Sequence, residues 1–178
     1  MELETYASEI LEKVGVKRGH IVLDFGCRSG MYTIPAAKMV GNEGKVYALA
    51  KDGWALDELM QRAKLANLRN IAIMYTYGEL EIELADDCID VVLLFDVFHS
   101  DYLPRPQQRR KLLGEVYRIL KSNGLFSVYP KHMESEARDE IESANFYLES
   151  EFSGIVIHDL KNLEKGQILN FRKKLKIT

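Results

Sequence analysis

Residues 22–30 read Val22-Leu23-Asp24-Phe25-Gly26-Cys27-Arg28-Ser29-Gly30 and are the most informative segment of this 178-residue chain. They continue an almost unbroken apolar run that starts at Ile21, as in a strand buried on both faces. Gly26 and Gly30 then allow backbone conformations and close approaches that a Cβ atom would block. Since residues 31–40 have a helical pattern, the segment predicts a strand, a tight turn and the start of a helix.

The predicted turn has the chemistry of a site for a zwitterionic group. The helix after it begins with free N–H groups and the positive end of a dipole, which suit a carboxylate. Asp24, at the carboxyl end of the strand, offers its own carboxylate to an ammonium group. A dinucleotide site would need the pattern G-x-G-x-x-G, but Arg28 and Met31 stand where its second and third glycines belong. Taken alone, the loop also fits a tight turn that binds no ligand.

Strands and helices are predicted to alternate along the rest of the chain. Further strands are expected at 45–50, 70–75, 89–95 and 125–129, and helices at 5–14, 54–66, 107–120 and 134–145. Helices of this length connect parallel strands, whereas the short link between strands 154–158 and 167–172 favours an antiparallel hairpin. We therefore expect an α/β fold: a doubly wound, mostly parallel seven-stranded sheet with an antiparallel C-terminal hairpin and helices on both faces. Such a sheet binds its ligand beyond the carboxyl ends of the strands, where the strand order reverses.

Composition argues against several other classes of protein. Apolar residues make up 47% and charged residues 29% of the chain, as in an ordinary globular domain. The net charge of −3 gives no reason to expect nucleic acid binding, and the basic cluster Arg105, Arg109, Arg110 and Lys111 suits a solvated helix face. No apolar stretch approaches the roughly 20 residues of a membrane span, and the first residues do not resemble a secretion signal. Two cysteines suggest neither a disulfide framework nor a metal site, so we expect a cytoplasmic protein without metal.

Several segments, in a fixed order, resemble one enzyme family. Besides residues 22–30, they are 44–49 (Gly-Lys-Val-Tyr-Ala-Leu), 86–92 (Asp-Asp-Cys-Ile-Asp-Val-Val), 95–99 (Phe-Asp-Val-Phe-His) and 114–124 (Gly-Glu-Val-Tyr-Arg-Ile-Leu-Lys-Ser-Asn-Gly). Together they resemble the class I S-adenosylmethionine-dependent methyltransferases, particularly the small ubiquinone/menaquinone-biosynthesis-like group. The first matches that family's hydrophobic, acid and G-C-G-x-G motif, and the last its E-x-x-R-x-L-K-P-G-G helix and turn. The resemblance covers residues 14–129.

The resemblance implies a Rossmann-like fold in one domain, 1–178, that binds S-adenosylmethionine. Its parts would be an N-terminal helical segment (1–16), a cofactor-binding core (17–130) and a C-terminal helix and hairpin (131–178). The implied reaction is in-line methyl transfer to a small-molecule acceptor, because the chain has no nucleic-acid-binding module. A non-catalytic member that binds a ligand or protein partner is the alternative, motivated by Arg28 and Ala50, which depart from the family pattern.

The same resemblance assigns candidate cofactor-binding residues. Those in the glycine loop surround the methionine part of the cofactor: Asp24, Gly26, Cys27, Arg28 and Gly30. Asp96, just past the fourth strand, faces the same part. Ala50 stands where relatives carry an acid for the ribose hydroxyls, so Asp52 either takes that role or caps the next helix. Glu79 lies near an acid that contacts adenine in relatives, or is a surface glutamate.

One residue is a candidate for catalysis. His99 follows the fourth strand, where an imidazole is placed to orient or deprotonate an acceptor. A hydrogen-bonded loop histidine is the other interpretation. The remaining histidines, His20, His132 and His158, show no partner pattern in the sequence. A base is needed only if the acceptor is a hydroxyl or a protonated amine.

Overall fold

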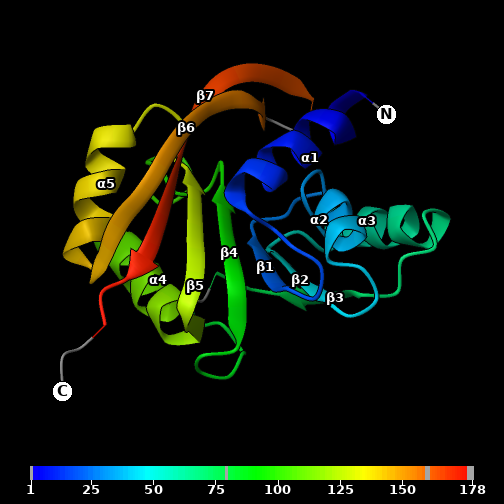
Figure 1. Cartoon of the computed structure of the whole chain (residues 1–178), viewed down its shortest axis with the longest axis horizontal. Coiled ribbons are helices and arrows are strands. Elements are labelled where there is room, and N and C mark those ends of the chain that lie inside the picture. Colours follow the sequence, from blue (N-terminus) through cyan, green and yellow to red (C-terminus); the bar gives the residue numbers. More distant parts are fainter. Residues whose placement is uncertain (1, 79, 159–160, 176–178) are drawn as a thin grey trace.

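The computed structural model describes residues 2–78, 80–158 and 161–175. Within them, the strands form one seven-stranded sheet in the order β3-β2-β1-β4-β5-β7-β6 (Figure 1). The strands are β1 (Ile21–Phe25), β2 (Lys45–Ala50), β3 (Ile71–Tyr75), β4 (Ile89–Phe95), β5 (Leu120–Tyr129), β6 (Phe146–His158) and β7 (Asn162–Lys173). The helices are α1 (Glu2–Val14), α2 (Thr33–Val40), α3 (Gly53–Leu65), α4 (Pro106–Ile119) and α5 (Glu134–Ser143).

The topology confirms the α/β fold expected from the sequence. Strands β3, β2, β1, β4 and β5 are mutually parallel, and β7 runs antiparallel to both β5 and β6. The chain moves outward from β1 to β2 and β3, and then returns to place β4 on the other side of β1. The strand order therefore reverses between β1 and β4. The segments that follow these two strands meet there, and such a reversal is where open α/β sheets bind ligands.

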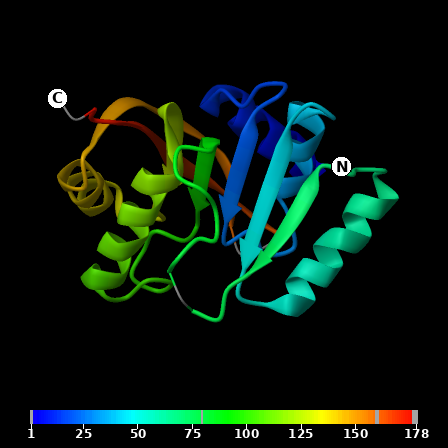
Figure 2. The ribbon, with the colours of Figure 1, turned by 90° about the horizontal axis from the view of Figure 1, so that it is seen from below.

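Successive side chains of each strand point to opposite faces of the sheet. Because the central strands are apolar on both faces, helices cover both. Val22 of β1 packs with the apolar side chains of α1 and α2, whereas its neighbour Leu23 packs with those of α4 and α5. In Figure 2, α3 lies beside β3 at the opposite end of the view from α5. None of the helices in the described part of the chain has the length and apolar character needed to cross a membrane.

The start of β5 differs from the prediction. Residues 122–124, expected to separate a helix from a strand beginning at Leu125, lie inside β5, which starts at Leu120. Pairing with β4 passes from Ile89↔Leu120 to Val91↔Leu125, so the extra residues form an irregularity in the ladder. A turn-forming Ser-Asn-Gly sequence therefore marks a bulged strand here, because tertiary pairing with β4 overrides its local preference.

The C-terminal hairpin is longer than predicted. The expected strands covered residues 154–158 and 167–172, but β6 and β7 pair from Phe146↔Lys173 to His158↔Asn162. The additional part of β6 alternates mostly exposed and half-buried side chains, so it carries no apolar run that would mark a strand. Its extended conformation is set by pairing with β7 rather than by its own composition.

Candidate functional site

Asp24 stands at the carboxyl end of β1 with its carboxyl group enclosed. The residue is 3% exposed, and Thr33 Oγ1 of α2 donates a hydrogen bond to its Oδ2 at 2.6 Å. Burial raises the pKa of Asp24 to about 6, although the Thr33 hydroxyl works in the opposite direction. A cation brought next to this group would stabilise its ionised form. Asp24 is thus suited to binding an ammonium group.

Two glycines shape the loop that follows Asp24. Gly26 has a φ of +78°, and a Cβ atom on it would lie 2.4 Å from Val97 Cγ2. Gly30 has a φ of +84°, and its Cβ atom would lie 2.3 Å from Leu59 Cδ1. Both positions need glycine for conformation and for space, as their spacing in the sequence suggested.

Arg28 adopts a conformation unusual for a residue with a side chain. Its φ is 48°, in the left-handed region. Its side chain is 38% exposed, and Nη2 lies 3.3 Å from Oδ2 of Asp96, which follows β4. The structure pairs its guanidinium with a carboxylate across the strand reversal.

Asp96 is the centre of a cluster of ionisable side chains formed with Arg28, His99 and His158. Its own φ is 59°, and the residue is 5% exposed. Its Oδ2 lies 3.0 Å from Nδ1 of His158, at the end of β6. Nε2 of His99 lies 3.4 Å from Oδ1 but hydrogen-bonds the main-chain oxygen of Asp96 at 3.0 Å. Burial acts to raise the pKa of the Asp96 carboxyl, but His99, His158 and Arg28 outweigh it and hold the pKa below its usual range.

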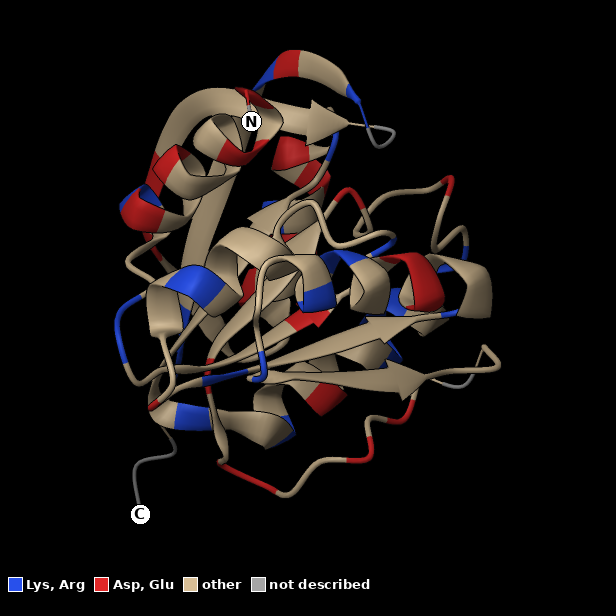
Figure 3. Ribbon diagram, turned by 90° about the vertical axis from the view of Figure 1, so that its right-hand side faces the viewer, with Lys and Arg blue, Asp and Glu red and all other residues tan. Residues whose placement is uncertain are grey.

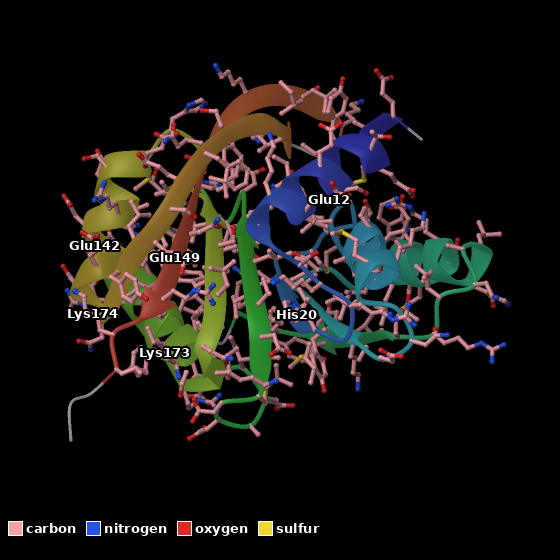
Figure 4. The ribbon with its side chains drawn as sticks, in the orientation of Figure 1. Glu12, His20, Glu142, Glu149, Lys173 and Lys174 are labelled. Carbon is pink, nitrogen blue, oxygen red and sulfur yellow. The ribbon has the colours of Figure 1, made fainter. Side chains whose placement is uncertain are left out.

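His158 is the member of this cluster that sequence reasoning missed. The residues it joins are 62 positions apart in the sequence, so no local spacing reveals the pair. The available signal was its place at the end of a predicted strand. His20, by contrast, directly precedes β1 and lies at the opposite end of the sheet (Figure 4).

Two hollows adjoin over the glycine loop and share Gly26 and Arg28. The smaller, of about 30 Å³, is lined by Asp24, Gly26, Cys27, Arg28, Met31, Tyr32, Phe95, Asp96 and Ile157. The larger, of about 300 Å³, is lined by Gly26, Arg28, Ser29, Ala50, Lys51, Asp52, Trp54, Ala55, Glu58 and Tyr102. A small hollow with two acidic side chains in its lining therefore adjoins a roomier one with exposed aromatic surface.

The segment between β4 and α4 forms one wall of the larger hollow. Tyr102 lies beneath the ammonium group of Lys51, with Nζ 4.7 Å from the ring centroid. Arg109 of α4 secures this segment, since its Nη1 donates to the main-chain oxygen of Leu103 at 2.6 Å. The expectation of a solvated basic face is wrong for Arg109, which is 6% exposed and also bonds Glu140 of α5. A neighbouring helix supplies its carboxylate, so the guanidinium is buried with its charge paired.

The other residues singled out in the sequence have different settings. Asp52 Oδ1 accepts a hydrogen bond from Trp54 N at 2.9 Å and so caps α3, while also lining the larger hollow. Burial raises the pKa of the Cys27 thiol, which therefore stays neutral. His99 lines neither hollow and is 5% exposed. Glu79 lies outside the described residues.

His99 nevertheless has a defined tautomer in its neutral form. A main-chain oxygen only accepts hydrogen bonds, so the Nε2 that faces the Asp96 oxygen carries the proton. Nδ1 is then the basic nitrogen, 3.9 Å from Oδ2 of Asp101. Within the described residues, no group of three His, Cys, Asp or Glu side chains is arranged to hold a metal ion.

Comparison with known proteins identifies a family. The family model described as "Methyltransferase domain" matches residues 16–174. A probable cobalt-precorrin-6B C(15)-methyltransferase of Saccharolobus solfataricus is 36% identical over 75 residues, 42% of this chain and 38% of that protein. A demethylmenaquinone methyltransferase of Lactobacillus johnsonii is 29% identical over 119 residues, 67% of this chain and 47% of that protein. The chain thus spans less than half the length of these two relatives.

The fold also matches solved structures. A SAM-dependent methyltransferase from Aquifex aeolicus superposes with a TM-score of 0.77 at 21% identity, covering 95% of this chain and 90% of that one. At this identity the match concerns the fold. It agrees with the strand order and the antiparallel β7 described above.

Proposed function

The chain belongs to the methyltransferase domain family, and from that premise we propose that it transfers a methyl group from S-adenosylmethionine to a small-molecule acceptor. The observation that carries the proposal is the buried Asp24 carboxyl beside the loop of Gly26 and Gly30, at the point where the strand order reverses. The Asp24 carboxylate suits the ammonium group of an amino-acid moiety, and the adjoining larger hollow is where a nucleoside would lie.

The residues around the hollows fit S-adenosylmethionine in charge and in shape. Asp24 would bind the ammonium group, and Asp52 remains our candidate for the ribose hydroxyls although it also caps α3. Trp54, which is 73% exposed, and Tyr102 offer aromatic surface to the adenine. When bound, the cofactor supplies a methyl group on a positively charged sulfur that is already a good leaving group.

The protein's own contribution is to bind the methyl donor and the acceptor, to align them, and to exclude water from the site. Two acidic side chains, Asp24 and Asp96, line the smaller hollow, so its potential favours a cationic ligand. The guanidinium of Arg28 offsets part of that charge. His99 remains our candidate to take a proton from a hydroxyl or amine substrate, at Nδ1, although its buried side chain lines neither hollow in this structure.

A small acceptor is favoured by the relatives. Those named above are called methyltransferases of a precorrin and of demethylmenaquinone. From these names we apply to this chain only the proposal that its methyl acceptor is a small molecule. Cytoplasmic location, expected from composition, belongs to the same proposal.

A non-catalytic protein of this family is the second candidate. Arg28 replaces the family's middle glycine, and its guanidinium is held by Asp96 beside the smaller hollow. Ala50 leaves the end of β2 without the family's acid. Under this alternative the chain would bind a ligand or a protein partner and transfer nothing.

Calorimetric titration with S-adenosylmethionine and S-adenosylhomocysteine tests the proposal. We expect binding by the wild type and its loss in Asp24→Asn, which keeps the shape of the side chain and removes its charge. Asp57→Asn on the exposed side of α3 is the matched control and should bind as the wild type does. Absence of binding by the folded wild type would contradict the proposal. Binding without transfer of a labelled methyl group to any small-molecule class would favour the second candidate.

A further inference from the structure

Strand β3 is an edge of the sheet with outward-facing main-chain groups. Among the described residues it pairs only with β2, and the hydrogen bonds Val46 N→Asn70 O and Thr76 N→Ala50 O set which residues face β2. Main-chain groups alternate sides along a strand, so residues 70, 72, 74 and 76 face β2. The N–H and C=O groups of Ile71, Ile73 and Tyr75 therefore point away from the sheet. These are the groups through which an edge strand can accept another strand.

The residues of this edge carry neither of the two commonest sequence features that protect an edge strand from pairing, charge and proline. Residues 70–78, Asn-Ile-Ala-Ile-Met-Tyr-Thr-Tyr-Gly, contain no charge and no proline. Edges of monomeric sheets are normally guarded by charged side chains, proline, bulges or a covering segment. In Figure 3 the ribbon of β3 carries neither acidic nor basic colour.

The surface around β3 is also unusually apolar. Ten large apolar side chains are exposed among the described residues, and six of them belong to α3, β3 and the residue pair after it. They are Trp54 (73% exposed), Met60 (36%), Leu65 (89%), Ile73 (45%), Tyr75 (49%) and Tyr77 (86%). Such a concentration marks an interaction surface rather than scattered exposure.

We propose that a second copy of this chain docks on β3, edge to edge and antiparallel, about a twofold axis at Ile73. Ile73 then lies opposite the Ile73 of the second copy, and Ile71 lies opposite Tyr75 in both directions. Residues directly opposite in such a ladder exchange both N–H···O bonds, so all three outward-facing residues are satisfied at once. Two seven-stranded sheets become one continuous sheet.

The charges fit this register as well as the main-chain groups do. In this register each of residues 70–76 lies opposite an uncharged residue of the second copy, so no like charges face each other. Just beyond, Arg69 comes opposite Tyr77, a pairing of a cation with an aromatic ring. A shift of the axis to Ile71 or Tyr75 would place two of the three outward-facing residues opposite positions outside β3. The edge is therefore self-complementary in the register centred on Ile73.

The interface would border the larger hollow. A Cβ atom on Gly53 would lie 3.1 Å from Cε2 of Tyr75, and Trp54, the next residue, lines that hollow. The proposal does not depend on methyl transfer, because it rests on β3 and on the apolar surface beside it.

Sedimentation velocity over a range of concentrations tests the proposal. We expect a dimer for the wild type and for Ile73→Thr, which keeps a β-branched side chain. In Ile73→Lys two ammonium groups meet at the axis, so the dimer dissociation constant should rise by about tenfold or more. Thermal unfolding of each variant shows that the fold is kept.

Cysteine cross-linking tests the register. Opposite residues of a hydrogen-bonded antiparallel pair have Cα atoms about 5.5 Å apart, within the range that a disulfide spans. In a Cys88→Ser background, Ile73→Cys should form disulfide-linked dimers on mild oxidation. Leu65→Cys, more exposed but away from the axis, should not. A monomeric wild type, a dimer that Ile73→Lys leaves intact, or no preferential cross-linking of Ile73→Cys would each overturn the proposal.

Discussion

Nδ1 of His158 lies 3.0 Å from Oδ2 of Asp96, which joins the end of β6 to the end of β4. Both side chains are largely buried, and Arg28 reaches the same carboxylate oxygen from the glycine loop. The C-terminal hairpin is therefore tied directly to the point where the strand order reverses. Because the carboxylate also faces His99 in its own segment, a single residue links three segments around the candidate site: the glycine loop, the residues between β4 and α4, and the end of β6.

Removing His158 should weaken the fold in a pH-dependent manner. We expect His158→Ala to lower the free energy of unfolding at pH 7 by about 1–3 kcal/mol, the range for hydrogen bonds to charged groups. The pKa of the Asp96 carboxyl is lower in the folded protein than in the unfolded chain. The stability that its ionised form provides is therefore present above the unfolded-state pKa and is lost as the pH falls through the folded-state pKa. Urea denaturation at neutral and acidic pH should show the wild type and variant converging in acid.

Asp24 should give the opposite pH dependence. Its pKa is about 6 when folded, above the value of about 3.9 for an unfolded aspartate. Between these values the folded state binds more protons, so this group's contribution to stability rises as pH falls from about 7 to about 4, by roughly 2–3 kcal/mol. Asp24→Asn should lack this component, and comparison of the two denaturation series measures it.

The same protonation should weaken cofactor binding in acid. The ammonium group of the ligand needs the ionised carboxylate, so affinity for S-adenosylhomocysteine should fall about tenfold per pH unit below 6. Calorimetry at pH 5, 6 and 7 checks this. Constant affinity across that range would show that Asp24 does not meet the ligand's ammonium group.

The sequence was sufficient for features that depend on local pattern. Alternating apolar segments and helices predicted the parallel sheet, and the spacing of Gly26 and Gly30 predicted the tight loop. Features set by distant partners were missed. His158 meets Asp96, and Arg109 becomes buried against Glu140, only because the folded chain brings separate elements together. The pairing that draws residues 120–124 into β5 is likewise invisible in composition.

Arg118 should be essential for ordering the segment between β3 and β4. Its guanidinium donates to the main-chain oxygens of Leu84 at 2.7 Å and Ile82 at 2.8 Å, and it pairs with Asp86 and Glu115. Neither a helix nor a strand is present in the described residues of this segment, so these bonds carry much of its order. Arg118→Ala should lower unfolding free energy by about 2–4 kcal/mol. Arg118→Lys should recover little, since one ammonium cannot reproduce the fork of bonds.

Hydrogen exchange localises the effect of that change. Faster exchange should appear in residues 80–88 of Arg118→Ala, while the core strands keep their protection. Arg110→Ala, exposed on the same helix, is the matched control and should leave both properties unchanged. Uniformly faster exchange would indicate a global role for Arg118 instead.

The glycines offer a paired test of conformation and space. Gly26 has a positive φ and no room for a Cβ atom beside Val97, so Gly26→Ala should destabilise the fold by about 1–3 kcal/mol. It should also abolish binding of S-adenosylhomocysteine, because the loop must move. Gly114, inside α4, has no heavy atom within 4 Å of a built Cβ atom. Gly114→Ala should therefore stabilise the protein by about 0.4–1 kcal/mol through reduced freedom of the unfolded chain.

The two glycine-to-alanine substitutions should change stability in opposite directions. This outcome would separate the loop's need for glycine from a general effect of adding a methyl group. Thermal unfolding of both variants gives the signs, and calorimetry gives the binding. Val97→Ala combined with Gly26→Ala should recover part of the lost stability, since it removes the atom 2.4 Å from the new Cβ. The strain of a φ of +78° would remain, so recovery should be incomplete. Full recovery would show that space alone, and not backbone conformation, requires glycine at position 26.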